Sequence, residues 1–256
     1  MSYLSQVFVK ALVMAEMEVR KLFHDPTELV TRAIQPMLWL GIFGVALSKA
    51  RLESGGVPYL QFIAPGILAQ SVILIAIFYG LSIIWERDMG SLQKILVTPT
   101  PRLALVLGKM LSAGVRGLSQ AVIVFAFSRL LHIPLRVTAL SIVGVVIFVV
   151  LGAAIFSGIS MIIASIVKTR ERFMGIGQLI SLPLFFASNA IYPISVMPHW
   201  LQLVANFNPL SYMVAGLRAL LVTGVFDRLV LDFGVLLAAA GLISILSAYL
   251  YPKIAV

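Results

Sequence analysis

Long apolar stretches follow one another along almost the whole chain, each bounded by a short polar segment or by proline. Six of them have the length of a membrane-crossing helix, which needs about 20 residues. They cover Leu29–Leu47, Tyr59–Ile84, Leu103–Leu131, Val137–Val167, Phe173–Ile191 and Leu229–Leu250. Only 11% of the residues are charged, against roughly 25% in soluble domains, so the chain cannot cover a surface that faces water. We therefore predict an all-α integral membrane protein with six transmembrane helices, forming a single domain over residues 1–256.

The first 25 residues have a different pattern, in which apolar residues recur at helical spacing and polar residues lie between them. Leu4, Ala11 and Val19 belong to the apolar stripe, whereas Lys10 and Arg20 lie outside it. An amphipathic helix of this kind lies in the membrane interface, and we predict an interfacial helix over residues 1–25. The same stripe would also suit a helix that packs against a soluble partner.

Lys and Arg are unevenly divided between the two sides of the predicted bundle. With the N-terminus inside, twelve of them fall in cytoplasmic segments and six in outer segments. Because a Lys/Arg excess marks cytoplasmic loops, we expect a multi-pass protein of the cell (inner or plasma) membrane with both termini in the cytoplasm. The net charge of +9 is then explained by these loops and by contact with membrane lipids, and we expect no nucleic acid as a partner.

Two polar segments interrupt the apolar pattern. Residues 85–102, WERDMGSLQKILVTPTPR, lie on the predicted cytoplasmic side, and we interpret them as a contact element for another protein. Residues 192–228 lie on the predicted outer side and contain three prolines, with Trp200 and Tyr212 as interface anchors. Their apolar pieces are too short to cross a bilayer, which indicates re-entrant or interfacial helices before the sixth span.

Polar residues inside the predicted spans are candidates for a transport path. Arg116 lies in the third span, where it either extends its side chain to the headgroups or lines a polar path. The fifth span carries a polar face made of Gln178, Ser181, Ser188, Asn189 and Tyr192. Such a face must find partners in lipid, either by packing within the chain or at a subunit interface or conduit.

Several kinds of chemistry have no basis in this sequence. No cysteine is present, the three histidines are far apart, and no HExxH pair occurs, so we predict neither a metal site nor catalytic residues. Gly108-Lys109 lacks the remainder of a Walker motif, so we expect no nucleotide site. None of the ten acidic residues lies near the middle of a predicted span, which argues against an ion-coupled transporter.

Two motifs resemble those of a known family. ERDMGSLQKILVTPTPR resembles the cytoplasmic signature of the ABC type-2 exporter permeases, and FFASNAIYPISVMPHWLQLVANFNPLSYMVAGLRALL resembles their second hallmark. The likeness is greatest to the daunorubicin-resistance-like branch of drug and lipid exporters. Two positions depart from the pattern: Ser91 stands where threonine is common, and Ala215-Gly216 stands where many relatives carry an acidic residue.

The resemblance implies a permease subunit that carries no cofactor of its own. Two permeases, identical or paralogous, would pair, and two separate ABC ATPase subunits would bind ATP and magnesium and drive outward movement of an amphipathic drug, lipid or lipid-linked glycan. A coupling helix would lie between Glu86 and Pro101. The residues expected to couple to the ATPase are Glu86, Arg87, Asp88, Gly90, Ser91, Leu92, Leu96, Thr98, Pro99 and Arg102, and those of the re-entrant segment are Pro193, Asn208, Pro209, Tyr212 and Arg218.

Two other classes of function stay open at this point. An ion-coupled secondary transporter or a channel would have the same apolar spans, and would move its substrate without an ATPase. A membrane enzyme or assembly factor is the third candidate, although the sequence shows no catalytic constellation for it.

Overall fold

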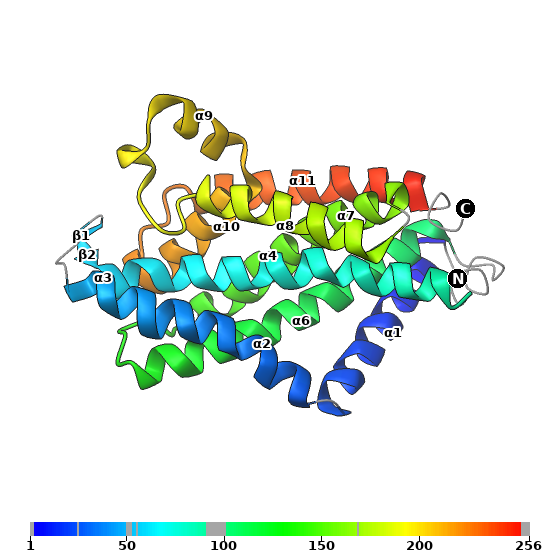
Figure 1. Cartoon of the computed structure of the whole chain (residues 1–256), viewed down its shortest axis with the longest axis horizontal. Helices are drawn as coiled ribbons and strands as arrows, with labels where there is room; N and C mark the ends of the chain where they lie inside the picture. Colours follow the sequence, from blue (N-terminus) through cyan, green and yellow to red (C-terminus); the bar gives the residue numbers. More distant parts are fainter. Residues whose placement is uncertain are drawn as a thin grey trace.

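A computed structural model describes residues 3–24, 26–49, 53–54, 56–90, 101–167 and 169–251 as an elongated helical bundle (Figure 1). Both chain termini lie at one end, here called the terminal end, and α9, α10 and the β1–β2 pair lie toward the other, the distal end. The elements are α1 (Tyr3–His24), α2 (Pro26–Leu38), the π-helix η1 (Trp39–Gly44), α3 (Val45–Lys49), β1 (Glu53–Ser54), β2 (Val57–Pro58), α4 (Tyr59–Asp88), α6 (Arg102–Leu130), α7 (Ala139–Ile166), α8 (Arg170–Phe186), the 3₁₀ turn η2 (Ile194–Val196), α9 (His199–Phe207), α10 (Pro209–Arg218), the π-helix η3 (Ala219–Thr223) and α11 (Leu229–Leu250).

Four described helices are long and apolar enough to cross a membrane: α4, α6, α7 and α11. They match the second, third, fourth and sixth predicted spans, so the all-α membrane class is confirmed. The first predicted span is instead divided into α2, η1 and α3. Pro36 lies inside α2 and removes a backbone donor, and the wider π-turn follows three residues later. The total of six spans stays a prediction.

The fifth predicted span is shorter than expected. α8 has 17 residues, or about 26 Å of helix, against a hydrocarbon layer of about 30 Å. It begins at Arg170 because the Thr169 hydroxyl accepts from the Arg172 amide at 3.4 Å. It ends at Phe186, where the hydroxyls of Ser188 and Tyr192 donate to the carbonyls of Phe185 and Phe186. Side chains that bond these carbonyls compete with a further helical turn.

α4 is the central element of the bundle and is buried along most of its length. It packs against α6, α7, α8 and α10. Its closest approach to the backbone of another segment, among the described glycines, is at Gly66, where an added Cβ would lie 2.2 Å from the carbonyl oxygen of Ala190. Glycine is therefore required at Gly66, and the turn after α8 lies directly on α4.

α1 is docked on α6 at the terminal end. Val7 and Ala11 are buried in this contact, and Met14 fills the space above Gly108 of α6. Several other apolar side chains of α1, among them Phe8 and Leu12, are exposed. The helix agrees with the predicted amphipathic segment, and its place at the membrane interface stays a prediction.

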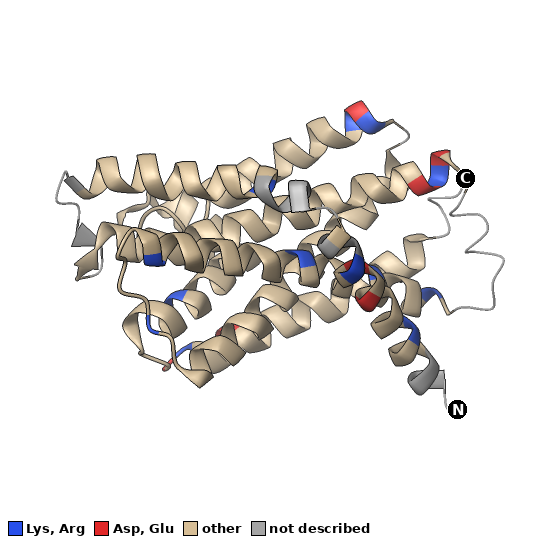
Figure 2. Ribbon diagram, turned by 90° about the horizontal axis from the view of Figure 1, so that it is seen from below, with Lys and Arg blue, Asp and Glu red and all other residues tan. Residues whose placement is uncertain are grey.

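The segment before α11 contains two helices with opposite environments. α10 is buried, with Leu210, Met213 and Leu217 fully enclosed, whereas α9 is largely exposed and presents Trp200 and Phe207. Long stretches of the ribbon carry no charge, and charged positions are concentrated toward the two ends (Figure 2).

Candidate functional site

The predicted contact element is formed, at its described ends, by the last turn of α4 and the first turn of α6. Glu86, Arg87 and Asp88 belong to α4 rather than to a loop, and Arg102 opens α6 as an exposed residue. Gly90 follows α4 with φ of +69°, a left-handed conformation that glycine adopts without steric cost. Five further coupling residues lie outside the described residues: Ser91, Leu92, Leu96, Thr98 and Pro99.

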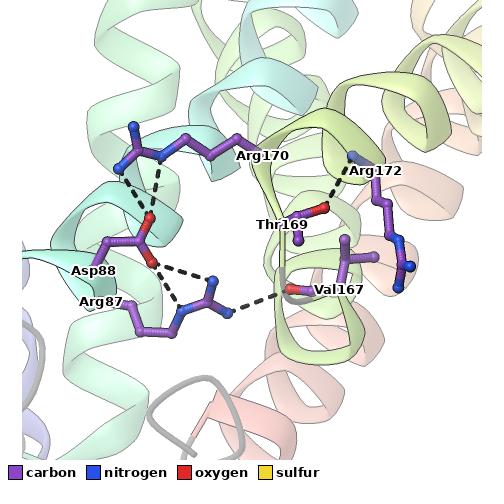
Figure 3. A network of polar contacts seen from close by, with 6 residues as sticks. All are labelled: Arg87, Asp88, Val167, Thr169, Arg170 and Arg172. Carbon is purple, nitrogen blue, oxygen red and sulfur yellow. Dashed lines mark hydrogen bonds and ion pairs between the residues drawn. The ribbon is translucent and has the colours of Figure 1, made fainter.

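Asp88 is the centre of a polar network that joins α4 to the start of α8 (Figure 3). Its carboxylate accepts from the Arg170 guanidinium at 2.9 and 3.1 Å and from Arg87 at 3.3 and 3.4 Å. Arg87 also donates to the carbonyl of Val167 at 3.3 Å. The Arg170 guanidinium lies 4.2 Å above the Trp85 ring. Residues 85–88 are thereby attached to the short connection between α7 and α8.

Glu86 pairs with Lys109 of α6, and both carboxylate oxygens lie 2.8 Å from Nζ. The Lys109 side chain is 4% exposed and that of Glu86 28%. Sequence reasoning considered Lys109 only as part of an incomplete Walker motif and missed this role. The pair joins α4 to α6 near the end of α4.

The three charged residues of α4 are bonded within the chain. Glu86, Arg87 and Asp88 each form an ion pair with another residue of the same chain. The side chain of Asp88 is still 36% exposed, so the network lies at the surface, and the predicted contact of these residues with another protein stays a prediction. The direct effect of the contacts is to hold α4, α6 and α8 together at the end of α4.

Arg116 is bonded to α1, and the two positions expected for it, at the headgroups or along a polar path, stay predictions. Its guanidinium forms an ion pair with Glu18 of α1 and lies 5.3 Å from the centre of the Tyr79 ring. The Glu18 side chain is 3% exposed, so the pair is buried between α1, α4 and α6. The sequence did contain a signal for it: Glu18 lies seven residues after Ala11, on the side of α1 that faces α6.

The residues of the predicted polar face of the fifth span have different environments in the structure. Ser181 and Ser188 are buried and donate to carbonyls of their own chain, at 2.8 and 2.7 Å. Asn189 is buried beside α10, Tyr192 is half-buried, and Gln178 is exposed. The two serines therefore follow the intrachain alternative, and a role of this face in a path or interface stays a prediction.

At the distal end, Asn208 holds the segment before α11 against α8. Its Nδ2 donates to the carbonyls of Leu184 and Ala187 at 2.7 and 3.0 Å, and its Oδ1 caps α10 at the Leu210 amide. Pro209 occupies the first turn of α10, where its missing N–H costs nothing. The Tyr212 hydroxyl donates to the Asn206 carbonyl at 2.6 Å, and Pro193 precedes η2.

Arg218, at the end of α10, joins three parts of the chain. It donates to the carbonyl of Phe62 at 3.3 Å and to that of Asn189 at 2.7 Å, and its guanidinium lies 3.7 Å above the Phe62 ring. The side chain also lines a cavity of about 360 Å³ between α9, α10 and the start of α11. Among the residues described, no three His, Cys, Asp or Glu side chains lie close enough together to hold a metal ion.

Comparison with known proteins assigns the family. Residues 9–222 match the family model described as ABC-2 type transporter. The chain belongs to the ABC-2 type transporter family. The predicted resemblance is therefore confirmed, and the protein is a multi-pass membrane permease subunit of an ABC transporter.

Relatives within this family include other permeases. The chain is 30% identical over 211 residues to the putative transport permease ycf38 of Cyanophora paradoxa, covering 79% of this chain and 72% of that protein. It is 29% identical to the inner membrane transport permease YadH of Escherichia coli K12, over 81% and 80% of the two chains. It is 24% identical to the daunorubicin resistance ABC transporter permease protein DrrB1 of Streptomyces coeruleorubidus, over 77% and 70%.

Proposed function

We propose that this permease is the membrane-spanning subunit of an ATP-driven exporter. Two copies, or one copy and a paralogue, pair in the cell membrane with their termini in the cytoplasm, and two separate ATPase subunits bind ATP and magnesium. The cargo is an amphipathic drug, lipid or lipid-linked glycan that moves outward. Family membership supports the ABC assembly, and similarity to the daunorubicin resistance permease DrrB1 supports an amphipathic drug as one cargo class.

The observation that carries the coupling proposal is the network around Asp88. Residues 91–100 connect α4 and α6, which the Glu86–Lys109 pair holds together. Arg170 ties the end of α4 to α8 through Asp88. A force applied by an ATPase to residues 91–100 therefore acts on three helices of the bundle at once. In this role Asp88 and Arg170 are positioning residues, because they set the place of the contact element.

The test compares two arginines of α8 in the complex of the tagged permease with the ABC ATPase subunits that copurify with it. Arg170→Ala removes the pair with Asp88 and the contact with Trp85. Arg172→Ala is the matched control, because the backbone amide of Arg172, and not its guanidinium, donates to the Thr169 hydroxyl (Figure 3). We expect Arg170→Ala to lower permease-stimulated ATP hydrolysis about fivefold, as for loss of roughly 1 kcal/mol, with unchanged membrane insertion.

Two results would contradict this proposal. The first is full stimulation of ATP hydrolysis by the Arg170→Ala complex. The second is transport by the permease alone in liposomes with an ion gradient, which would favour the secondary-transporter alternative.

A further inference from the structure

The distal cavity contains polar groups that the proposed coupling mechanism does not use. Its lining includes Asn189 from the turn after α8, Ser211 and Arg218 from α10, and Asp232 from the first turn of α11. Ile194 and Ala215 contribute apolar surface to the same cavity. Its volume of about 360 Å³ lies within the range of small-molecule sites.

Three of these polar side chains are more than nine-tenths buried and have no hydrogen-bond partner for their oxygen atoms in the described part of the chain. Asn189, Ser211 and Asp232 are 8%, 5% and 3% exposed. Among the described residues, Oδ1 of Asn189 and Oγ of Ser211 take part in no hydrogen bond, and the Asp232 carboxylate forms no hydrogen bond or ion pair there. Because buried polar groups are almost always bonded, three of them around one cavity indicate a ligand that bonds them.

The cations near the cavity do not satisfy these acceptors. Arg218 directs its Nε and Nη2 at the carbonyls of Phe62 and Asn189, and no hydrogen bond joins it to the three acceptors among the described residues. Arg228 is exposed at the rim, and its charge acts on the Asp232 carboxylate from a distance without an ion pair between the two described side chains. The unsatisfied groups are a carboxylate, an amide oxygen and a hydroxyl, which together accept N–H bonds from a positively charged donor.

We propose that the distal cavity binds the protonated amine of an amphipathic compound. The ammonium group lies between Asp232, Asn189 and Ser211, and the apolar part of the compound lies against the Ile194 and Ala215 surface. The inference rests on the proposed export function, since it names the cargo chemistry that the outer end of the permease would accept. The amine can belong to a free amphipath or to a lipid headgroup.

Binding is tested with the full chain in phosphatidylcholine nanodiscs and the fluorescent amine dansylcadaverine, corrected for empty nanodiscs. Its N-acetyl derivative is the uncharged comparison. We expect saturable binding of the amine and at least about tenfold weaker binding by Asp232→Asn, because a charge-assisted bond is lost. Asp227→Asn, which removes an exposed carboxylate from the same rim, is the matched control and should change affinity less than about twofold.

Two further measurements use a variant that disturbs folding less and a lipid that can supply the amine. Ser211→Ala, the milder variant, should bind about threefold more weakly, which tests the site even if Asp232→Asn does not fold. Phosphatidylethanolamine in the nanodisc should compete with the probe if lipid headgroups supply the amine, and should leave its affinity unchanged if free amphipaths do. Binding of the N-acetyl derivative as tightly as the amine, or equal affinities for wild type, Asp232→Asn and Ser211→Ala, would overturn the inference.

The binding test and the coupling test can each refute one proposal without refuting the other. No ATPase is present in the nanodiscs, so a permease that stimulates ATP hydrolysis but does not bind the amine refutes only the cargo chemistry. Conversely, Arg170→Ala should bind dansylcadaverine with wild-type affinity, because Arg170 lies at the terminal end of the bundle.

Discussion

The two ends of the bundle are held together by different chemistry. At the terminal end, helices are joined by pairs of charged side chains: Glu86 with Lys109, Asp88 with Arg170, and Glu18 with Arg116. At the distal end, Asn208 and Arg218 bond backbone carbonyls of other segments. The charge pairs join one side chain to another, whereas the distal bonds run from a side chain to the backbone of another segment. Most terminal contacts therefore depend on two side chains, and the distal contacts depend on one side chain and the position of a backbone carbonyl.

Breaking the most buried charge pair gives the largest expected effect. Arg116→Met removes the guanidinium from Glu18, whose side chain is 3% exposed. Loss of one partner of a buried pair costs about 3 kcal/mol, so the apparent midpoint of thermal unfolding in detergent should fall by about 10 °C. Glu18→Gln combined with Arg116→Met should recover most of this loss. A double variant as unstable as Arg116→Met would show that the pair is not the cause.

The second variant lies nearer the distal end and tests a contact with a backbone carbonyl. Gly66→Ala places a Cβ 2.2 Å from the Ala190 carbonyl oxygen, and overpacking of this kind costs about 2 kcal/mol. Gly175→Ala in α8 is the matched control, because its Cβ would meet nothing within 4 Å and alanine favours a helix. The same thermal assay should show a loss for Gly66→Ala and no loss for Gly175→Ala. Equal midpoints would argue against the close contact of α4 with the turn after α8.

Asn208→Ala should have the smallest effect of the three. It removes the cap of α10 and two bonds to carbonyls near the end of α8, worth about 1 kcal/mol together in net terms. Asn206→Ala, at an exposed position two residues earlier, provides the baseline. If both variants unfold at the same temperature, the distal end does not depend on this side chain.

The sequence predicted the elements better than their contacts. Apolar length identified α4, α6, α7 and α11 because burial in lipid requires it. Apolar length overestimated the fifth span. The apolar pattern continues to Ile191, but the hydroxyls of Ser188 and Tyr192 bond the last carbonyls of α8 and the helix ends at Phe186.

The site was predicted only in part, for a physical reason. The motif located Glu86, Arg87 and Asp88, but their partners Lys109 and Arg170 lie 23 and 82 residues away in the chain. Hydropathy and charge counts carry no information on such pairs. Asp232 was assigned no role, because an acidic residue near the end of a span has the sequence signature of an ordinary interfacial residue.

α4 connects both ends of the molecule in one piece. Near its start, the Phe62 carbonyl accepts from Arg218 beside the distal cavity, and at its last residue Asp88 accepts from Arg170. Phe62 and Asp88 are 26 positions apart, which corresponds to roughly 39 Å of helix at about 1.5 Å per residue. Because α4 is one continuous helix that is buried along most of its length, we expect a displacement of Asp88 along the helix axis to be transmitted to Phe62. The hydrogen bond from Arg218 to the Phe62 carbonyl would then couple a movement of α4 to the wall of the distal cavity.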